Sequence, residues 1–498
     1  MKKNVFLALF LASAILLCSC GDENQSAEKN DNEKSESISQ GAESEGITEN
    51  SSSESSEIAD ASKPTDEESA DNNQSSNNES SESEESSEED SMDNAESSED
   101  YENEEVLSSG VDGNVSWEVR GKTLVIKGNG AMKDYSLEDE NEAPWRNDDF
   151  ARKATRIVVE EGITTIGEDA FTSMNFEKIS LPKTLTELKS GAFSYCDVLQ
   201  SIVIPDGVSE IGVSVFAGCL SLSNVTFPKS LKTIKSIAFD CCYSLKNVIL
   251  PEGLETIEEG AFEECTSLTE ITIPSTVTKI ETNVFWNAYS IKSYKVAEGN
   301  KNYVIEDGVL FSSDKKTLVA FPPKNEKTSY NIPSGIEIIE GGAFSSCENL
   351  KEIVIPETVK IIGDYAFSYC TFPRITIPQG VEEIGSHAFK RCNNIEYIVL
   401  PDSVTSIGDY AFTECGKLKR ITLSNELKIL PSGFLCYCNA LESITIPESI
   451  EKIEEFAFVL TKLKTISFKG TEDQWNNIEK EHNWFPGEIG KKIVKFLK

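Results

Sequence analysis

Apolar residues recur along most of the chain, and the stretch Leu245 to Leu268 shows one complete unit of the pattern. In LKNVILPEGLETIEEGAFEECTSL, a leucine and an alternating apolar pair precede a proline, and a second apolar pair precedes Ala-Phe-x-x-Cys. Within each block of units the step is 22 to 24 residues, which predicts a solenoid with one coil per unit. Aligned on its phenylalanine, the unit recurs at Phe171, Phe193, Phe216, Phe239, Phe262, Phe285, Phe344, Phe367, Phe389, Phe412, Phe434 and Phe458.

Each unit predicts a strand followed by tight turns. Val248 and Leu250 alternate with variable residues, as in a half-buried strand. Pro251 marks the end of this strand because proline has no N–H to donate to a neighbouring strand. Residues 258–265 are predicted to form a tight helical turn with Phe262 facing the core. Because a single coil cannot bury its own apolar side, the coils must stack and bring equivalent residues into columns.

A column of cysteines follows the phenylalanines at a distance of three residues. We interpret it as a row of buried, reduced thiols, since free cysteine packs as a small apolar residue. Disulfides between coils about 5 Å apart, or a metal, stay open as alternatives. Cys241 and Cys436 lie outside the column and are expected to be exposed. The column holds Cys196, Cys219, Cys242, Cys265, Cys347, Cys370, Cys392 and Cys415, and also Cys438 if the coil after Phe434 is one residue longer.

These units resemble the BspA-like leucine-rich repeat family of bacterial surface proteins. LQSIVIPDGVSEIGVSVFAGC (residues 199–219) and LKEIVIPETVKIIGDYAFSYC (residues 350–370) match its pattern, and matching units cover about residues 156–468. The resemblance implies an α/β leucine-rich repeat solenoid of parallel strands and short helical turns. It also implies a non-catalytic, often adhesive role at the cell surface, without identifying a ligand.

The first twenty residues predict a secretion signal with a lipid attachment site. Lys2 and Lys3 precede an apolar run of 13 residues, which is too short to span a membrane. The sequence Leu17-Cys18-Ser19-Cys20 resembles a bacterial lipobox, which makes Cys20 the candidate for lipidation and the lipid the expected link to the membrane. Release of a free protein after an ordinary secretion signal is the alternative.

Residues 21–105 predict a disordered acidic linker. They hold 30 Asp and Glu against 3 Lys and Arg, which gives -27 of the chain's net charge of -39. Such a segment cannot bury enough apolar surface to offset the entropy of the free chain. We expect a stalk of at most about 300 Å that carries the folded part away from the membrane. A tolerated linker without a spacer role is the alternative.

Three further segments depart from the repeat. Residues 106–155 alternate like strands and are interpreted as an N-terminal cap, with a separate binding domain as the alternative. An irregular insertion at about 291–330 predicts three short strands between turns, either as a variant coil in a continuous core or as a protruding hairpin. Residues 469–498 are interpreted as a C-terminal cap that starts with a helix capped by Thr471.

The sequence suggests little catalytic chemistry. The chain has two histidines, His387 and His482, and His387 takes a position held elsewhere by Asp169, Tyr365 and Tyr410, so we expect an outward side chain. No phosphate-binding glycine loop, calcium loop or zinc spacing is present, and no cofactor or metal is expected. The acidic balance argues against nucleic acid as a partner. Carboxylate pairs of a polymer-degrading enzyme stay open, because neighbours in a solenoid come from distant positions.

The variable residues of the first strands form the candidate ligand face. A solvated strand face without a ligand is the plainer interpretation, because threonine and valine there follow from strand preference alone. Three functions stay open: a surface protein that binds an extracellular protein or glycan, a self-associating structural protein, and a scaffold or polymer-degrading enzyme. The candidate residues are Lys246, Asn247, Lys351, Glu352, Glu396, Tyr397, Lys419 and Arg420.

Overall fold

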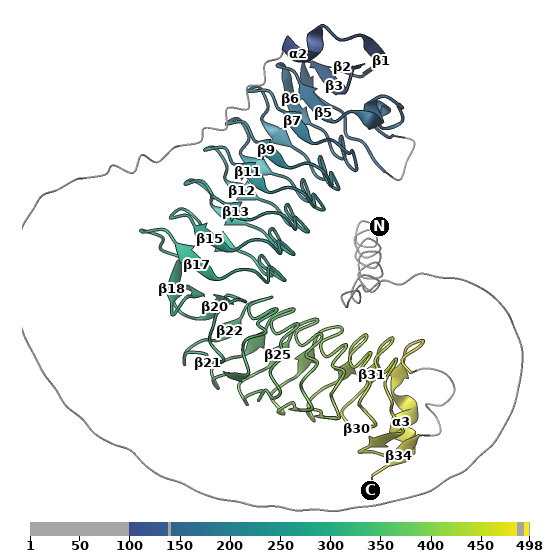
Figure 1. Cartoon of the computed structure of the whole chain (residues 1–498). Coiled ribbons are helices and arrows are strands. Elements are labelled where there is room, and N and C mark those ends of the chain that lie inside the picture. Colours follow the sequence, from purple (N-terminus) through teal and green to yellow (C-terminus); the bar gives the residue numbers. More distant parts are fainter. Residues whose placement is uncertain (1–98, 138–140, 486–492, 498) are drawn as a thin grey trace, which may run out of the picture. The chain divides into compact units, whose positions relative to one another are not determined.

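The computed structural model describes residues 99–137, 141–485 and 493–497 (Figure 1). The predicted secretion signal, Cys20 and most of the predicted linker lie outside these residues. The described residues belong to one compact unit, which is a solenoid of short, mostly parallel strands and confirms the predicted repeat fold. Within the described residues, the only α-helices are α2 (Glu99–Glu102) and α3 (Glu472–Asn477).

Each coil except the one that begins near residue 372 contributes a first strand, which carries the leucine-x-x-apolar pattern. Neighbouring first strands pair in parallel and in register, for example Val248 with Ile271 and Ile271 with Tyr294. The first strands are β5 (Arg156–Val159), β7 (Lys178–Ser180), β9 (Ser201–Val203), β11 (Asn224–Thr226), β13 (Asn247–Val248), β15 (Glu270–Ile273), β17 (Ser293–Val296), β21 (Ser329–Asn331), β23 (Glu352–Val354), β26 (Tyr397–Val399), β28 (Arg420–Thr422), β30 (Ser443–Ile446) and β32 (Thr465–Phe468).

The second apolar pair of each coil forms a second, shorter strand after the proline turn. These strands also pair in parallel, as Ile234 does with Ile257. They are β4 (Gly130–Ala131), β6 (Ile163–Ile166), β8 (Glu187–Leu188), β10 (Glu210–Ile211), β12 (Thr233–Ile234), β14 (Thr256–Ile257), β16 (Lys279–Ile280), β22 (Ile338–Ile339), β24 (Ile361–Ile362), β25 (Glu383–Ile384), β27 (Ser406–Ile407), β29 (Ile429–Leu430), β31 (Lys452–Ile453) and β33 (Glu479–Lys480).

The turn around each phenylalanine closes the coil and is not helical, which corrects the predicted helical turn. The N–H of Phe239 donates to the carbonyl of Ala261 in the next coil (2.9 Å), and the N–H of Cys241 donates to the carbonyl of Glu263 (3.0 Å). Ile237 and Cys241, two residues before and after Phe239, have φ of 50° and 56°. A left-handed conformation at Ile237 and Cys241 prevents a continuous helix. Alternate N–H groups of the turn therefore donate hydrogen bonds to carbonyls of the neighbouring coil.

The phenylalanines stack through the core as predicted. The rings of Phe239 and Phe262 lie 5.4 Å apart with an interplanar angle of 4°, and similar stacks run from Phe171 to Phe285 and from Phe344 to Phe412. Stacked aromatic rings of this kind add to the stability that their burial already provides.

One coil departs from the aligned phenylalanines. Leu435, rather than Phe434, takes the position of the stacked phenylalanine, because its N–H donates to Ala457 O as those of the other members do to the next coil. Phe434 therefore meets Phe412 edge-on, at 87°. Because Leu435 takes the phenylalanine position, Cys438 follows that position by three residues and belongs to the cysteine column.

The cysteines of the column are free and buried thiols in the structure. Each thiol lies against the phenylalanine carbonyl of the preceding coil, as Cys265 Sγ donates to Phe239 O at 3.2 Å. The thiol thereby fills a small apolar space and also meets a buried carbonyl oxygen. Contrary to expectation, Cys436 is buried as well, and Cys241 is only half-exposed.

Residues before the first repeat form an antiparallel extension of the first-strand sheet. β1 (Val106–Asp112) pairs with β2 (Val115–Arg120), β2 pairs with β3 (Thr123–Gly128), and β3 runs parallel to β5. Two short 3₁₀ helices follow, η2 (Pro144–Arg146) and η3 (Ala151–Lys153). The folded part begins before residue 106, because Tyr101 of α2 is buried against Val125 and Val158. The predicted linker of residues 21–105 is therefore too long at its C-terminal end.

The insertion forms a three-stranded meander, β18 (Tyr303–Glu306), β19 (Val309–Ser312) and β20 (Thr317–Ala320), with the turns where the sequence predicts them. The meander is therefore not a protruding hairpin. It is also not a variant coil within one continuous core. Leu310 belongs to the apolar cluster of the preceding coils, whereas Val309 and Phe311 belong to that of the following coils. The meander is thus a layer between two cores, and the stack of coils changes direction there (Figure 1).

The last coil is covered by α3 and by β34 (Val494–Phe496), which pairs with β32. Thr471 caps α3 as predicted: its Oγ1 accepts from Gln474 N, and the Gln474 side chain accepts from Thr471 N. Trp475 and Ile478 are buried in the second core.

Candidate functional site

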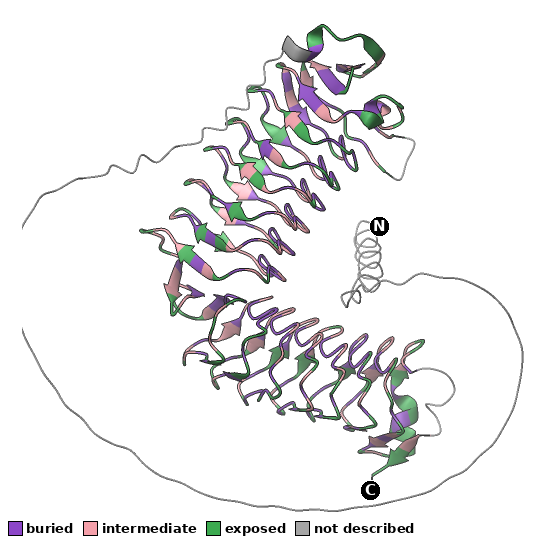
Figure 2. Ribbon diagram, viewed as in Figure 1, coloured by how far each residue is buried: buried purple, intermediate pink, exposed green. Residues whose placement is uncertain are grey.

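The outward side chains of β5 to β32 are here called the first-strand face, which the meander interrupts between β17 and β21. Its residues alternate with buried ones: Asn247 is exposed, Val248 is buried, and Ile249 is 84% exposed. Figure 2 shows this alternation of exposed and buried positions along the strands of successive coils. Because the strands within each sheet, such as β26, β28, β30 and β32, are bonded to their neighbours, they hold these side chains on a rigid support.

The structure separates the eight candidate residues into three places on this face. Seven are exposed and Glu396 is half-buried. Lys246 and Asn247 lie at β13 and Lys351 and Glu352 at β23, so these two pairs do not meet. The remaining four lie on the adjacent strands β26 and β28, where Tyr397 is directly opposite Arg420.

Several lysines of the first-strand face are held by glutamates of the neighbouring coil. Lys419 Nζ lies 2.8 Å from Glu396 Oε2, and the pairs Lys464–Glu442 and Lys295–Glu270 show the same distance. These side chains are exposed, apart from the half-buried Glu396, so the pairs contribute little to stability. They do neutralise these lysines locally, which lowers their value for binding an anionic ligand.

Arg374 belongs to the same face and was not among the predicted residues. It lies in the coil between β23 and β26, whose first segment forms no assigned strand. Its neighbours follow the usual alternation, with Ile375 buried and Thr376 exposed. The segment PRITIP (residues 373–378) matches the repeat and was the signal that could have identified Arg374.

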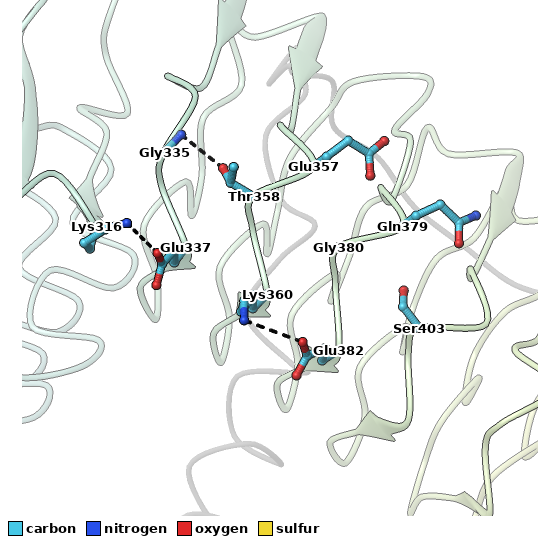
Figure 3. A pocket seen from close by; sticks show the side chains of 10 residues that line it. All are labelled: Lys316, Gly335, Glu337, Glu357, Thr358, Lys360, Gln379, Gly380, Glu382 and Ser403. Carbon is cyan, nitrogen blue, oxygen red and sulfur yellow. Dashed lines mark hydrogen bonds and ion pairs between the residues drawn. The ribbon is translucent and has the colours of Figure 1, made fainter.

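A shallow groove of about 340 Å³ lies on another side of the second stack, where the turns after the proline meet the second strands (Figure 3). Thr358 links two coils there, because its Oγ1 accepts from Gly335 N and donates to Ile336 O. Most of its charges are paired, and it is lined by Lys316, Gly335, Glu337, Glu357, Thr358, Lys360, Gln379, Gly380, Glu382 and Ser403.

His387 is not an outward side chain, which corrects the expectation from the sequence. Its ring is stacked between those of Tyr365 (4.6 Å) and Tyr410 (5.2 Å). Burial, with a smaller effect of the nearby charge of Lys390, lowers the pKa of His387 to about 3. Its Nδ1 is buried and has no hydrogen-bond partner. A neutral imidazole held in this way packs between two coils and is not paired with a nucleophile.

The thiols are equally unsuited to catalysis or metal binding. Burial raises the pKa of Cys265 and Cys347 well above the usual value, which disfavours the thiolate that acts as nucleophile and ligand. No group of three or more His, Cys, Asp or Glu in the described ranges is arranged to hold a metal ion. Across those same ranges, no helix has the length and apolar character needed to cross a membrane.

Comparisons with known proteins agree with this architecture. A family model described as BspA type leucine-rich repeat region matches residues 151–219, 186–315, 319–395 and 360–478. A leucine-rich repeat protein from Eubacterium ventriosum is 24% identical, with a TM-score of 0.53 over 78% of this chain and 96% of that chain. The pneumococcal vaccine antigen PcpA is 22% identical, with a TM-score of 0.50 over 79% of this chain and 98% of that chain. No curated protein matches the chain.

Proposed function

Because the chain belongs to the BspA-type leucine-rich repeat family, we propose that it is a non-enzymatic cell-surface protein whose first-strand face binds an extracellular protein or glycan. The observation that carries this proposal is the composition of the face itself. Ile249, Tyr397 and Val399 are 84%, 55% and 61% exposed, and unpaired cations lie beside the last two. Exposed apolar and aromatic side chains on a rigid support are typical of recognition surfaces in repeat proteins.

The proposed location rests on the N-terminal sequence. Cys20 is the proposed lipidation site, and residues 21–98 are the proposed spacer between the membrane and the solenoid, since α2 already packs on the folded part. The name of PcpA describes that protein as a vaccine antigen, which fits exposure of a similar solenoid outside the cell. The test is Cys20→Ser: the unchanged protein should partition into detergent and carry a modified N-terminal peptide, whereas the variant should stay in buffer. Equal partitioning of both would refute lipidation.

The binding role is tested with the full-length chain in a neutral detergent. It is presented to extracellular-matrix proteins, mucins and bacterial surface glycans at two salt concentrations. We expect saturable binding to one class, weakened by the face variant Asn247→Ala/Tyr397→Ala. Lys428→Ala/Glu451→Ala is the matched control, because it removes an exposed ion pair at the second strands. Equal loss in the two variants, or no binding at all, would contradict the proposal.

Self-association is the second candidate, because both ends of the solenoid leave an edge strand. β1 ends one sheet and exposes Val106, Leu107 and Val111, and β34 ends another and exposes Phe496. Unpaired strand edges with apolar side chains can pair with another copy. Concentration-dependent sedimentation that disappears in Val111→Lys, together with an absence of ligand binding, would favour this candidate.

A further inference from the structure

The first-strand face carries one row in which cations and an aromatic ring alternate from coil to coil. Arg374, Tyr397 and Arg420 occupy the same outward position in three successive coils, because Ile375, Ile398 and Ile421 are the buried residues that follow them. Successive coils are about 4.8 Å apart, so the two arginines lie about 10 Å apart at the backbone with the tyrosine between them.

The next outward position of the same coils alternates in the same way. Thr376 and Thr422 follow the two arginines, and Val399, which is 61% exposed, follows Tyr397. The surface thus repeats every second coil: a guanidinium with a hydroxyl, then an aromatic ring with an apolar side chain, then a guanidinium with a hydroxyl.

The two guanidinium groups are free to bind a ligand. Within the part of the chain that the structure describes, neither Arg374 nor Arg420 forms an ion pair or a side-chain hydrogen bond. The nearby lysines are occupied: Lys419 pairs with Glu396, and Lys351 donates to Glu348 O and Thr371 Oγ1. The chain has a net charge of -39, so two unpaired arginines in one row give this part of the face a positive charge that contrasts with the chain as a whole. Glu352 is exposed one coil before Arg374 and limits the row on that side.

We propose that Arg374, Tyr397 and Arg420 bind an acidic polysaccharide, with acidic groups on the two arginines and an intervening sugar ring on Tyr397 and Val399. Arginine binds carboxylate and sulfate groups with two parallel hydrogen bonds, and exposed threonines can bond sugar hydroxyls. An extended acidic peptide fits less well, because its side chains on one face recur every 7 Å or so, against about 10 Å between the arginines.

This inference rests on the proposed function, since it names the ligand class of the same face. The full-length chain is tested for binding to heparin, hyaluronate, neutral dextran and poly-glutamate. We expect binding to at least one acidic polysaccharide and none to dextran. Arg374→Gln/Arg420→Gln should weaken it by about tenfold or more, because each lost contact is a hydrogen bond to a charged group. Tyr397→Ala should weaken it several-fold at unchanged salt dependence.

The matched control is Lys295→Gln/Lys464→Gln, which removes the same charge from the same face but only from lysines already paired with glutamates. We expect less than a twofold change. Equal weakening by both double variants would show that only the number of positive charges matters, which would overturn the inference. Tighter binding of poly-glutamate through the same arginines would assign the row to acidic peptides instead. If the chain binds another ligand through the face but no acidic polysaccharide, the proposed function stands and this inference falls.

Discussion

The indole ring of Trp286 packs against the phenol ring of Tyr365 with their centroids 4.4 Å apart, and its Nε1–H donates to Ser368 Oγ at 3.0 Å. These residues belong to coils on opposite sides of the meander. They meet because one turn is missing between them. Phe321 stacks on Phe344, but the chain passes from Phe321 directly into Pro322 and forms no turn like those of the other coils. The turns on either side of the missing one therefore contact each other and join the two stacks.

Replacing Trp286 should weaken this junction. Trp286→Ala is expected to lower the free energy of unfolding by about 3 kcal/mol, the range found when a buried tryptophan is removed. Because the two cores meet at this place, the unfolding transition should also broaden or split. Chemical denaturation followed by circular dichroism measures both. Ile249→Ala, at an exposed position, is the control and should change little. A single unchanged transition for Trp286→Ala would show that the junction carries no stability.

The stacked phenylalanines should account for a large share of core stability. Phe262 is fully buried between Phe239 and Phe285, so Phe262→Ala is expected to cost about 3 to 5 kcal/mol. Phe262→Leu should cost less, because Leu435 takes the equivalent position in another coil. Phe150→Ala, at a side chain that is 46% exposed, is the control. Equal effects of Phe262→Ala and Phe150→Ala in thermal or urea denaturation would contradict the stacked core.

The column cysteines should be unreactive in the native protein and reactive after unfolding. Burial raises the pKa of Cys265 and Cys370, so the native thiols stay protonated and out of reach of a thiol reagent. Unfolding without a reductant should expose at least the nine thiols of the column. The measurement is a count of reactive thiols before and after denaturation. An increase clearly below nine would reveal disulfides between coils.

His387 should make the protein sensitive to acid. Its folded-state pKa of about 3 lies below the ordinary value near 6.5, so folding favours the neutral imidazole. This stability is fully present above about pH 6.5 and is lost as the pH falls toward 3, by at most about 1.4 kcal/mol per pH unit. His387→Tyr should remove that part of the slope and keep the stack, since Tyr365 and Tyr410 hold the same position. His482→Gln, at the exposed histidine, is the control. Identical slopes in the two variants would refute the assignment.

The repeat was predictable from the sequence because each coil is a local structure. The spacing of Val248, Leu250 and Phe262 follows from alternation in a strand and from one turn, and stacking then follows because a coil cannot bury its apolar side alone. The helix at Thr471 and the three short strands of the insertion were predictable for the same reason, since caps and turns depend on few neighbouring residues.

What required the tertiary structure were the relations between coils. The predicted helical turn was wrong because only alternate N–H groups bond within the turn, whereas those between them donate to the next coil. Cys436 is buried and His387 is half-buried between two tyrosine rings because residues of adjacent coils cover them. Leu435 stacks in place of Phe434 because the register with the next coil decides which side chain points into the core.

The same holds for the candidate ligand face. The sequence by itself determined the repeat, the outward positions of the strands and the acidic N-terminal segment, since these depend on local pattern and composition. Only the tertiary structure decided which outward residues are neighbours and which cations are already paired. It left Arg374 and Tyr397 exposed on successive coils and placed Lys246 and Lys351 on opposite sides of the meander, because neighbours in a solenoid depend on the number of coils between residues and on where the stack is divided.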